Sequence, residues 1–185
     1  ASGMYDIVLA LGYEKLKDTG FPGLGVGRPP HPVWQQLWTA PAAFAFIASR
    51  YFEYAGLTVE EGREILARIA VKNHHNGTMS PKAHLRREIT VEQALNAPII
   101  AWPLGLFDCC GTSDGASAAV LVRADMAKSF RDDPVYIKGI GASVDAVMPF
   151  FRAGFDYLGF DATRDAARQA YEQAGIKDPR KEIDI

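Results

Sequence analysis

Near the start of the chain stands the apolar run Ile7-Val8-Leu9-Ala10-Leu11-Gly12. A strand with one wet face would alternate apolar and polar residues. This run is continuous, which is typical of a strand that is buried on both faces of its sheet. The run Ser117–Val122 has the same character and follows the turn pair Asp114-Gly115. A third strand is expected at Val135–Ile140. Strands of this kind need helices on both faces, so the sequence predicts an α/β fold.

Two long helices are marked by their capping residues. Pro41 suits the first turn of a helix over Ala42–Ala55, which Gly56 would end. Thr58 and Glu61 have the spacing of a capping box, in which each residue satisfies a backbone donor of the other. The helix that they begin is expected to bury the side formed by Ile65, Leu66, Ile69 and Ala70.

Two shorter helices carry similar signals. Thr90 and Gln93 repeat the capping-box spacing for a helix that Pro98 would end. A last helix is expected over Ala162–Ala174, with Gly175 as its C-terminal cap.

The spacing of these elements is uneven. Residues 13–116 separate the first two strands and contain helices and loops. So few strands and helices cannot cover both faces of a sheet. The chain also opens just before a strand and closes on Glu182–Ile185, which has the character of an approach to another strand. We therefore expect an internal segment of a longer protein, or the ordered part of one.

The composition indicates an ordinary globular chain. Hydrophobic residues make up 48% and charged residues 23%, and Lys+Arg 20 against Asp+Glu 22 gives a formal net charge of −2. This charge balance offers no basic excess to attract nucleic acid or an anionic membrane. No apolar run approaches the roughly 18–20 residues needed to cross a bilayer. Two adjacent cysteines cannot form a disulfide framework. We expect a reduced, cytoplasmic protein that binds neither nucleic acid nor membrane.

A glycine-rich segment, Gly23–Gly27, has the composition of a phosphate-binding loop. A dinucleotide fingerprint must follow a strand and open a helix, however. Here Arg28-Pro29-Pro30 follows, which does not open a helix in register. The sequence favours a plain flexible loop.

The polar segment Lys72–Gly77 lies at the end of a predicted helix and carries His74 and His75. Adjacent histidines point to different sides of a helix, and neither they nor His84 has a carboxylate at ligand spacing, so no metal site is expected. Cationic and polar groups at this end relieve unpaired helix carbonyls. A contact with an anionic ligand is the alternative.

The two cysteines are candidates for a nucleophile. Activation of Cys109 or Cys110 would need a base or a helix N-terminus beside the thiol. Both instead precede a turn into a buried strand, where cysteine acts as a small apolar residue. Ser113 and Asp114 are interpreted as turn chemistry in preference to part of a catalytic triad.

Two further segments have an ordinary structural interpretation. The aromatic residues of the first half are expected in a core or interface, with the wall of an apolar substrate tunnel as the alternative. They are Trp34, Trp38, Phe44, Phe46, Tyr51, Phe52 and Tyr54. The charged cluster Lys177–Glu182 is interpreted as a solvated surface.

Five parts of the chain match motifs of one known family: Tyr5–Leu16, Val71–His74 with Ser80–His84, Thr90–Leu95, Asp108–Ala116 and Ala166–Ile176. Together they resemble thiolases, in particular the sterol-carrier-protein type and acetyl-CoA acetyltransferase-like branch. The segment Asp108–Ala116 is the most specific of them, and the resemblance covers essentially the whole chain.

This resemblance implies a thiolase-like fold fragment. The family has two similar αβαβαββ halves and a large insertion called the loop domain. The strands at Ile7–Gly12 and Ala116–Val122 would be the last two of the first half. Residues 1–130 would then end the first half, with a loop domain at about residues 14–113, and residues 131–185 would begin the second half. The long separation of the two strands is explained in this way.

The resemblance implies Claisen-type acyl transfer between CoA thioesters, with coenzyme A as substrate and no separate cofactor. The family's nucleophilic cysteine would precede Ala1 and its HD-F motif would follow Ile185. Cys109 and Cys110 match a structural position. No catalytic residue is therefore expected here, and the isolated chain is expected to be inactive. Lys72, Asn73, His74 and His75 are the candidates to contact CoA, since a phosphate favours cations and amide donors.

The family also implies partners and alternatives. Its members are commonly dimers, which predicts a homodimer. Some relatives lack the catalytic cysteine and act as retro-aldolases on steroid side-chain CoA thioesters with a small zinc-ribbon partner protein. The His-Met pair of many thiolases is replaced here by Thr39–Ala43, so no histidine contact to the acyl group is carried over. Two alternatives come from other classes: a non-catalytic acyl-CoA-binding or scaffold module, and a small hydrolase that uses Cys110 and a histidine.

Overall fold

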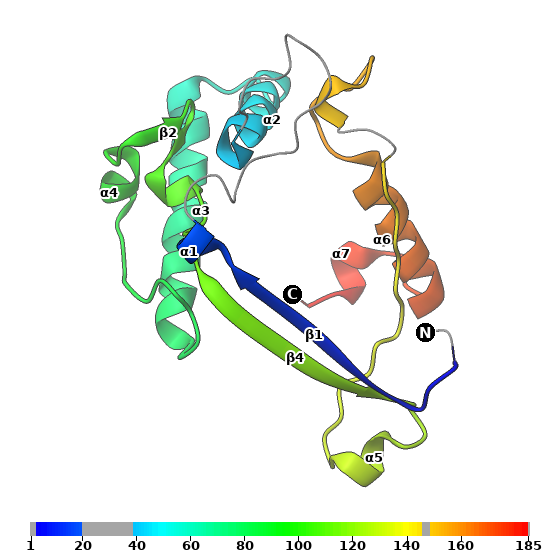
Figure 1. Ribbon diagram of the computed structural model, residues 1–185. Helices are drawn as coiled ribbons and strands as arrows, with labels where there is room; N and C mark the ends of the chain where they lie inside the picture. The colour runs from blue at the N-terminus through cyan, green and yellow to red at the C-terminus, as the bar shows by residue number, and fades with distance from the viewer. Residues whose placement is uncertain (1–2, 20–38, 146–148, 185) are drawn as a thin grey trace. The chain divides into compact units, whose positions relative to one another are not determined.

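The computed structural model describes residues 3–19, 39–145 and 149–184 and divides into two compact units (Figure 1). We call Glu14–Gly115 the insert unit. The outer unit comprises Ala1–Tyr13 and Ala116–Ile185. None of the described helices is both long enough and apolar enough to span a membrane.

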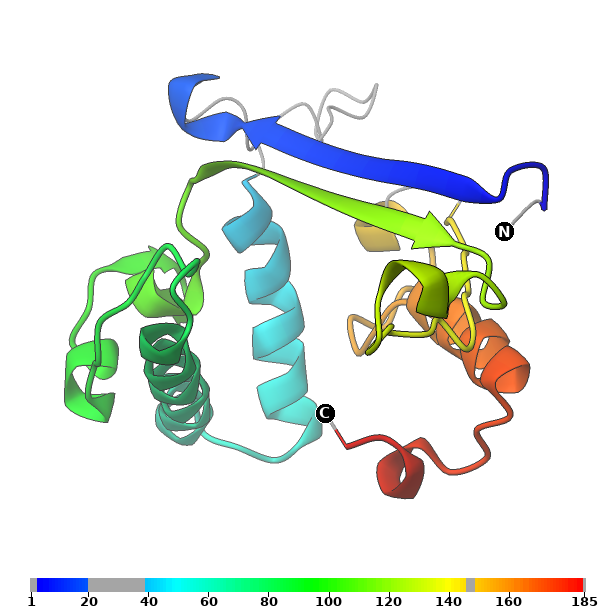
Figure 2. The same cartoon turned by 90° about the horizontal axis from the view of Figure 1, so that it is seen from below.

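Two long strands form a ribbon, β1 (Ile7–Lys15) and β4 (Asp114–Val122), which run side by side in opposite directions (Figures 1 and 2). Beside one end, the Arg123 amide donates to the Asp6 carbonyl over 3.2 Å. Both strand predictions are confirmed. Asp114 and Gly115, however, open β4 and do not form a separate turn.

The expected burial of these strands is wrong for the described residues. Every residue of β1 is exposed, and Leu9 and Val120 retain 65% and 67% of their accessible surface. The reason is that β1 and β4 pair only with each other among the described elements. With neither a third strand nor a covering helix layer, a continuous apolar run remains open to solvent.

The strand expected at Val135–Ile140 is also wrong, because this extended segment joins no ladder among the described strands. At its end the segment contacts helix α6 (Asp161–Ala174), where the Ile140 amide donates to Gln173 Oε1 over 3.1 Å. Gly141 permits this packing, since a Cβ there would lie 1.8 Å from the Ala166 carbonyl oxygen.

The insert unit contains three of the predicted helices and a small hairpin. Its elements are α1 (Leu16–Thr19), α2 (Ala40–Tyr54), α3 (Val59–Met79), α4 (Val91–Leu95), β2 (Ile99–Ala101), β3 (Leu104–Gly105) and the 3-10 turn η2 (Leu106–Asp108). Both predicted capping boxes are confirmed, at Thr58 with Glu61 and at Thr90 with Gln93. Gly56 follows α2 in the left-handed conformation, with φ 67°.

The insert unit's core is built from small residues and differs from the predicted one. Ala67, Ala70, Ile89 and Ala94 form the buried cluster. Of the residues expected on the buried side, Ala70 is buried and Leu66 is half-buried, whereas Ile65 and Ile69 keep 41% and 47% of their accessible surface. The face of α3 that packs most tightly is the one with Gly62, where an added Cβ would lie 2.6 Å from the ring of the buried Phe52.

The other aromatic residues of the first half do not form a core. Phe44, Phe46, Tyr51 and Tyr54 are exposed. Trp34, Trp38 and the glycine-rich segment lie outside the described residues.

The outer unit continues from β4 into short elements and one long helix. They are α5 (Ala127–Phe130), the 3-10 turn η3 (Pro149–Phe151), α6 and α7 (Pro179–Glu182). The last predicted helix is confirmed by α6, and Gly175 caps it with φ 74°. The interpretation of Lys177–Glu182 as a purely solvated surface is incomplete, because Glu182 Oε1 accepts the Lys177 and Asp178 amides.

Candidate functional site

The C-terminal half of α3 carries the polar residues singled out by the sequence, and two of them bind a neighbouring segment. The Nδ1 atom of His74 lies 2.9 Å from the Arg87 carbonyl oxygen, so it must carry the proton and donate. The His74 ring also packs edge-on against Phe107, with centroids 5.4 Å apart. His74 therefore joins α3 to two later parts of the insert unit.

His75 makes a parallel contact one residue further along. Its Nδ1 atom lies 2.8 Å from Glu88 Oε1. The two histidines were predicted to diverge, yet both rings reach consecutive residues, Arg87 and Glu88, of one segment. We call residues 80–89 the return segment. At Gly77 the helix backbone comes so close that a Cβ would lie 2.5 Å from the Leu85 carbonyl oxygen.

Lys72 and Asn73, the other two candidates, are exposed on α3. Lys72 forms no ion pair with any described residue. Of the four candidates, Lys72 and Asn73 thus present a cation and an amide to solvent, while His74 and His75 are bonded within the protein. Within the described ranges, no three His, Cys, Asp or Glu side chains gather into a potential metal site.

The cysteines lie just before β4 and are both free thiols. Cys109 is half-buried, and burial raises the pKa of its thiol, with smaller contributions from Asp108 and Cys110. A raised pKa keeps the group in the thiol form, which is neither nucleophilic nor a good metal ligand. Cys110 is exposed.

A serine–histidine contact was missed by the sequence analysis. Ser113 Oγ and His84 Nδ1 are hydrogen-bonded across 29 positions of the chain. The neighbouring Asp114 carboxylate accepts the Lys17 amide over 2.8 Å, so it binds a distant amide and not the local turn that was expected. No sequence signal links Ser113 to His84, because their spacing follows neither helical nor strand periodicity.

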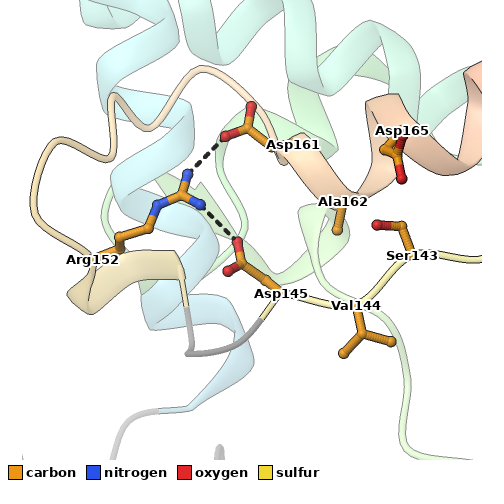
Figure 3. A pocket seen from close by; sticks show the side chains of 7 residues that line it. All are labelled: Ser143, Val144, Asp145, Arg152, Asp161, Ala162 and Asp165. Atoms are coloured by element: carbon orange, nitrogen blue, oxygen red, sulfur yellow. Dashed lines mark hydrogen bonds and ion pairs between the residues drawn. The ribbon is translucent and has the colours of Figure 1, made fainter.

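The outer unit has a charged pocket of about 280 Å³ at the N-terminus of α6 (Figure 3). Arg152 lies between two carboxylates and donates to Asp145 over 3.1 Å and to Asp161 over 2.8 Å. The bond from Arg152 lowers the pKa of Asp161. Asp165 is bound by Arg168 over 2.6 Å and contacts Ser143, so every charge in the pocket is already paired.

Comparison with known proteins identifies the family, although no family model matches the chain. The chain is 39% identical to an acetyl-CoA acetyltransferase of Methanothermobacter thermautotrophicus, over 95% of this chain and 45% of that protein. The chain belongs to the thiolase superfamily. It spans about half the length of this curated relative.

This thiolase-superfamily chain is also similar to two further proteins. It is 28% identical to sterol carrier protein 2 of Oryctolagus cuniculus, over 95% of this chain and 34% of that protein. A solved structure described as an Ltp2–ChsH2(DUF35) aldolase is similar with a TM-score of 0.71 and 25% identity, covering 95% of this chain and 46% of that one. The structure is therefore a mixed α/β, partial thiolase-like fold.

Proposed function

We propose that this chain is a segment of a thiolase-like acyltransferase that acts on CoA thioesters, by Claisen condensation or thiolysis. The observation that carries the proposal is the 39% identity to an acetyl-CoA acetyltransferase over nearly the whole chain. The insert unit, Glu14–Gly115, would be the loop domain, and residues 131–185 would begin the second half.

The segment's contribution would be binding and not chemistry. Lys72 and Asn73 offer a cation and an amide donor to a CoA phosphate, with which charge-assisted hydrogen bonds are strong. His74 and His75 would then be positioning residues, because their rings hold the return segment against α3. The raised pKa of Cys109 argues against a nucleophile at that position.

Calorimetry with CoA, together with an assay of acetoacetyl-CoA thiolysis, tests this proposal. We expect the chain to bind CoA without turnover, and Lys72→Gln to weaken binding about threefold, as loss of one exposed charge contact would. Lys17→Gln, which removes a cation from α1, is the matched control. Thiolysis that is lost on substitution of Cys109 or Cys110 would overturn the non-catalytic role.

A second candidate function is retro-aldol cleavage of steroid side-chain CoA thioesters, favoured by the likeness to an aldolase structure. The two reactions differ in their substrates: thiolysis transfers the acyl group to free CoA, whereas retro-aldol cleavage needs no second thiol. Tighter binding of a β-hydroxyacyl steroid CoA thioester than of acetoacetyl-CoA would favour the aldolase. A small zinc-ribbon partner belongs to this alternative.

We also propose a homodimer as the assembled state. The continuous apolar ribbon of β1 and β4 leaves surface that an assembly would cover. Light scattering on the purified chain gives its mass in solution, and a monomer at high micromolar concentration would contradict the proposal.

A further inference from the structure

We infer that the end of α3 and the return segment bind the nucleotide end of CoA, the adenosine that carries a diphosphate and a 3′-phosphate. The inference rests on the proposed function and deepens it, because it says which part of CoA this surface takes. Lys72 and Asn73 offer a single cation, whereas the phosphates of the nucleotide end carry several negative charges. Further cations are therefore needed close to Lys72, and the return segment supplies them.

The surface in question is rich in unpaired cations. We call the exposed side chains of Lys72, Lys82, Arg86 and Arg87 the basic patch. None of the four forms an ion pair with a residue in the described part of the chain. Their charges are thus available to a ligand. Because the whole chain has a formal net charge of −2, the patch is a local feature that suits a compact anion better than nucleic acid.

The carboxylates of the same two segments already have partners. Across residues 72–89 the four cations stand against one carboxylate, that of Glu88, which lies 2.8 Å from His75 Nδ1. Earlier on α3, Glu64 accepts from Arg68 over 2.6 Å. The charge balance of the end of α3 and the return segment therefore favours an anion.

Two further carboxylates follow residues that contact these segments. Asp108 accepts the Gly105 amide over 2.7 Å. Asp114 accepts the Lys17 amide over 2.8 Å. Neither binds a side chain of the basic patch, so the four cations keep their excess of charge.

The tertiary structure fixes the two arginines beside α3. Three contacts join the helix to the return segment: His74 with the Arg87 carbonyl, His75 with Glu88, and Gly77 with the Leu85 carbonyl. Arg86 stands between the contacts at Leu85 and Arg87. The backbone of both arginines is therefore held against the last two turns of the helix, which gives His74 and His75 their positioning role.

Lys72 belongs to the same surface. It precedes His75 by three positions on α3, and residues three apart are neighbours on a helix, with Cβ atoms about 5–6 Å apart. His75 contacts Glu88, which directly follows Arg87. Arginine binds phosphate through two parallel hydrogen bonds and lysine binds it as a point charge, so adjacent arginines with a lysine nearby suit a diphosphate.

The patch also includes apolar surface that a nucleotide base can cover. Met79, the last residue of α3, keeps 66% of its accessible surface, and Leu85 of the return segment keeps 48%. Methionine is flexible and packs favourably against aromatic rings. Cations around an exposed apolar pair fit a phosphorylated nucleoside better than they fit inorganic phosphate.

Isothermal titration calorimetry with the full chain tests the inference with four probes: CoA, adenosine 3′,5′-bisphosphate, adenosine and pantetheine. We expect the bisphosphate to bind and to displace CoA. Adenosine and pantetheine should bind at least about tenfold more weakly than CoA, because neither carries a phosphate. Pantetheine that binds as tightly as CoA, or a bisphosphate that does not displace CoA, would overturn the inference.

Variants locate the site. Arg86→Gln/Arg87→Gln should weaken the bisphosphate about tenfold, as loss of two exposed charge contacts would. Lys128→Gln/Arg180→Gln is the matched control, since it removes the same charge at exposed positions of α5 and α7. Glu88→Gln keeps an acceptor for His75 but removes the negative charge, so it should tighten binding about threefold. Weaker or unchanged binding in Glu88→Gln would count against the inference.

The same titrations separate this inference from the proposed function. CoA that binds the Arg86→Gln/Arg87→Gln variant and its control with equal affinity would refute the nucleotide contact and leave the proposed function standing. Bisphosphate binding that depends on Arg86 and Arg87, in a chain that does not bind CoA, would support the nucleotide site and overturn the proposed function.

Discussion

His75 Nδ1 lies 2.8 Å from Oε1 of Glu88, which stands 13 positions further along the chain. This contact and the bond from His74 to the Arg87 carbonyl tie the end of α3 to the return segment at consecutive residues. The polar end of α3 therefore connects this helix to the return segment and is also a candidate ligand-binding surface. A substitution there must be tested for both effects.

Substitution of His75 by Ala should loosen the return segment with a small loss of global stability. Both partners are more than half exposed, so the cost in the free energy of unfolding should be about 0.5 kcal/mol. Amide hydrogen exchange should accelerate at residues 84–89. Arg86→Gln is the control, because Arg86 makes no ion pair with a described residue. Equal exchange rates at residues 84–89 in the two variants would contradict a stabilising contact between His75 and Glu88.

The Thr58→Ala variant should lose about 1 kcal/mol of unfolding free energy, since the Thr58 hydroxyl accepts the Glu61 amide at the start of α3 over 3.2 Å. Urea denaturation followed by circular dichroism measures the loss. Thr58→Ser keeps the acceptor and should stay close to the unsubstituted protein. An equal loss of unfolding free energy in both variants would show that the Thr58 hydroxyl is not the stabilising group.

The same cap predicts a dependence on pH. Hydrogen bonds from the backbone and side chain of Thr58 lower the pKa of Glu61 below its ordinary value of 4.5. A lowered pKa adds stability that is present above 4.5 and is lost as the pH falls through the folded-state value. The denaturation midpoint of Glu61→Gln should therefore change less between pH 6 and pH 3 than that of the unsubstituted chain. If the midpoints of the two proteins changed equally between pH 6 and pH 3, Glu61 would not contribute to the pH dependence of stability.

Gly141 should not tolerate a side chain. A Cβ at this position would lie 1.8 Å from the Ala166 carbonyl oxygen, so Gly141→Ala should push the extended segment away from α6. A loss of about 1–3 kcal/mol is expected, as for other overpacked sites. Gly111→Ala, where nothing lies within 4 Å of the added atom, is the matched control. Thermal denaturation of both variants decides the point.

The two cysteines should react at different rates. Cys109 is half-buried with a raised pKa and Cys110 is exposed, so iodoacetamide at pH 7.5 should label Cys110 at least about threefold faster. Labelling of Cys109 should rise more steeply as the pH increases above 8. Single Cys→Ser variants assign the rates by mass spectrometry, and the difference should vanish in denaturant. Faster labelling of Cys109 would reopen its role as a nucleophile.

Local signals in the sequence predicted the helices well because their causes are local. A capping box needs only Thr58 and Glu61 at the right spacing, and a left-handed cap needs only Gly175. The family motifs could be recognised from the sequence for a similar reason, since they are short and contiguous.

Tertiary contacts decided what periodicity alone could not. The helical pattern of α3 selected Ile65, Leu66, Ile69 and Ala70 for burial. Ala70 is buried, but close packing at Gly62 and Ala67 shifts the buried face, so Ile65 and Ile69 remain exposed. The apolar segment at Val135–Ile140 has strand character, but it pairs with no described strand, and its Ile140 amide donates to Gln173 of α6. The partners of Ser113 and Arg152 likewise follow no spacing rule.

The sequence by itself determined the family, the positions of the principal helices and the existence of strands β1 and β4, because capping, apolar runs and motifs act over a few residues. Only the tertiary structure decided which faces are buried, that His74 and His75 hold the return segment, and that Arg152 lies between Asp145 and Asp161. The physical reason is that burial and charge pairing depend on residues that meet in space, and backbone packing at glycine and alanine sets which residues those are.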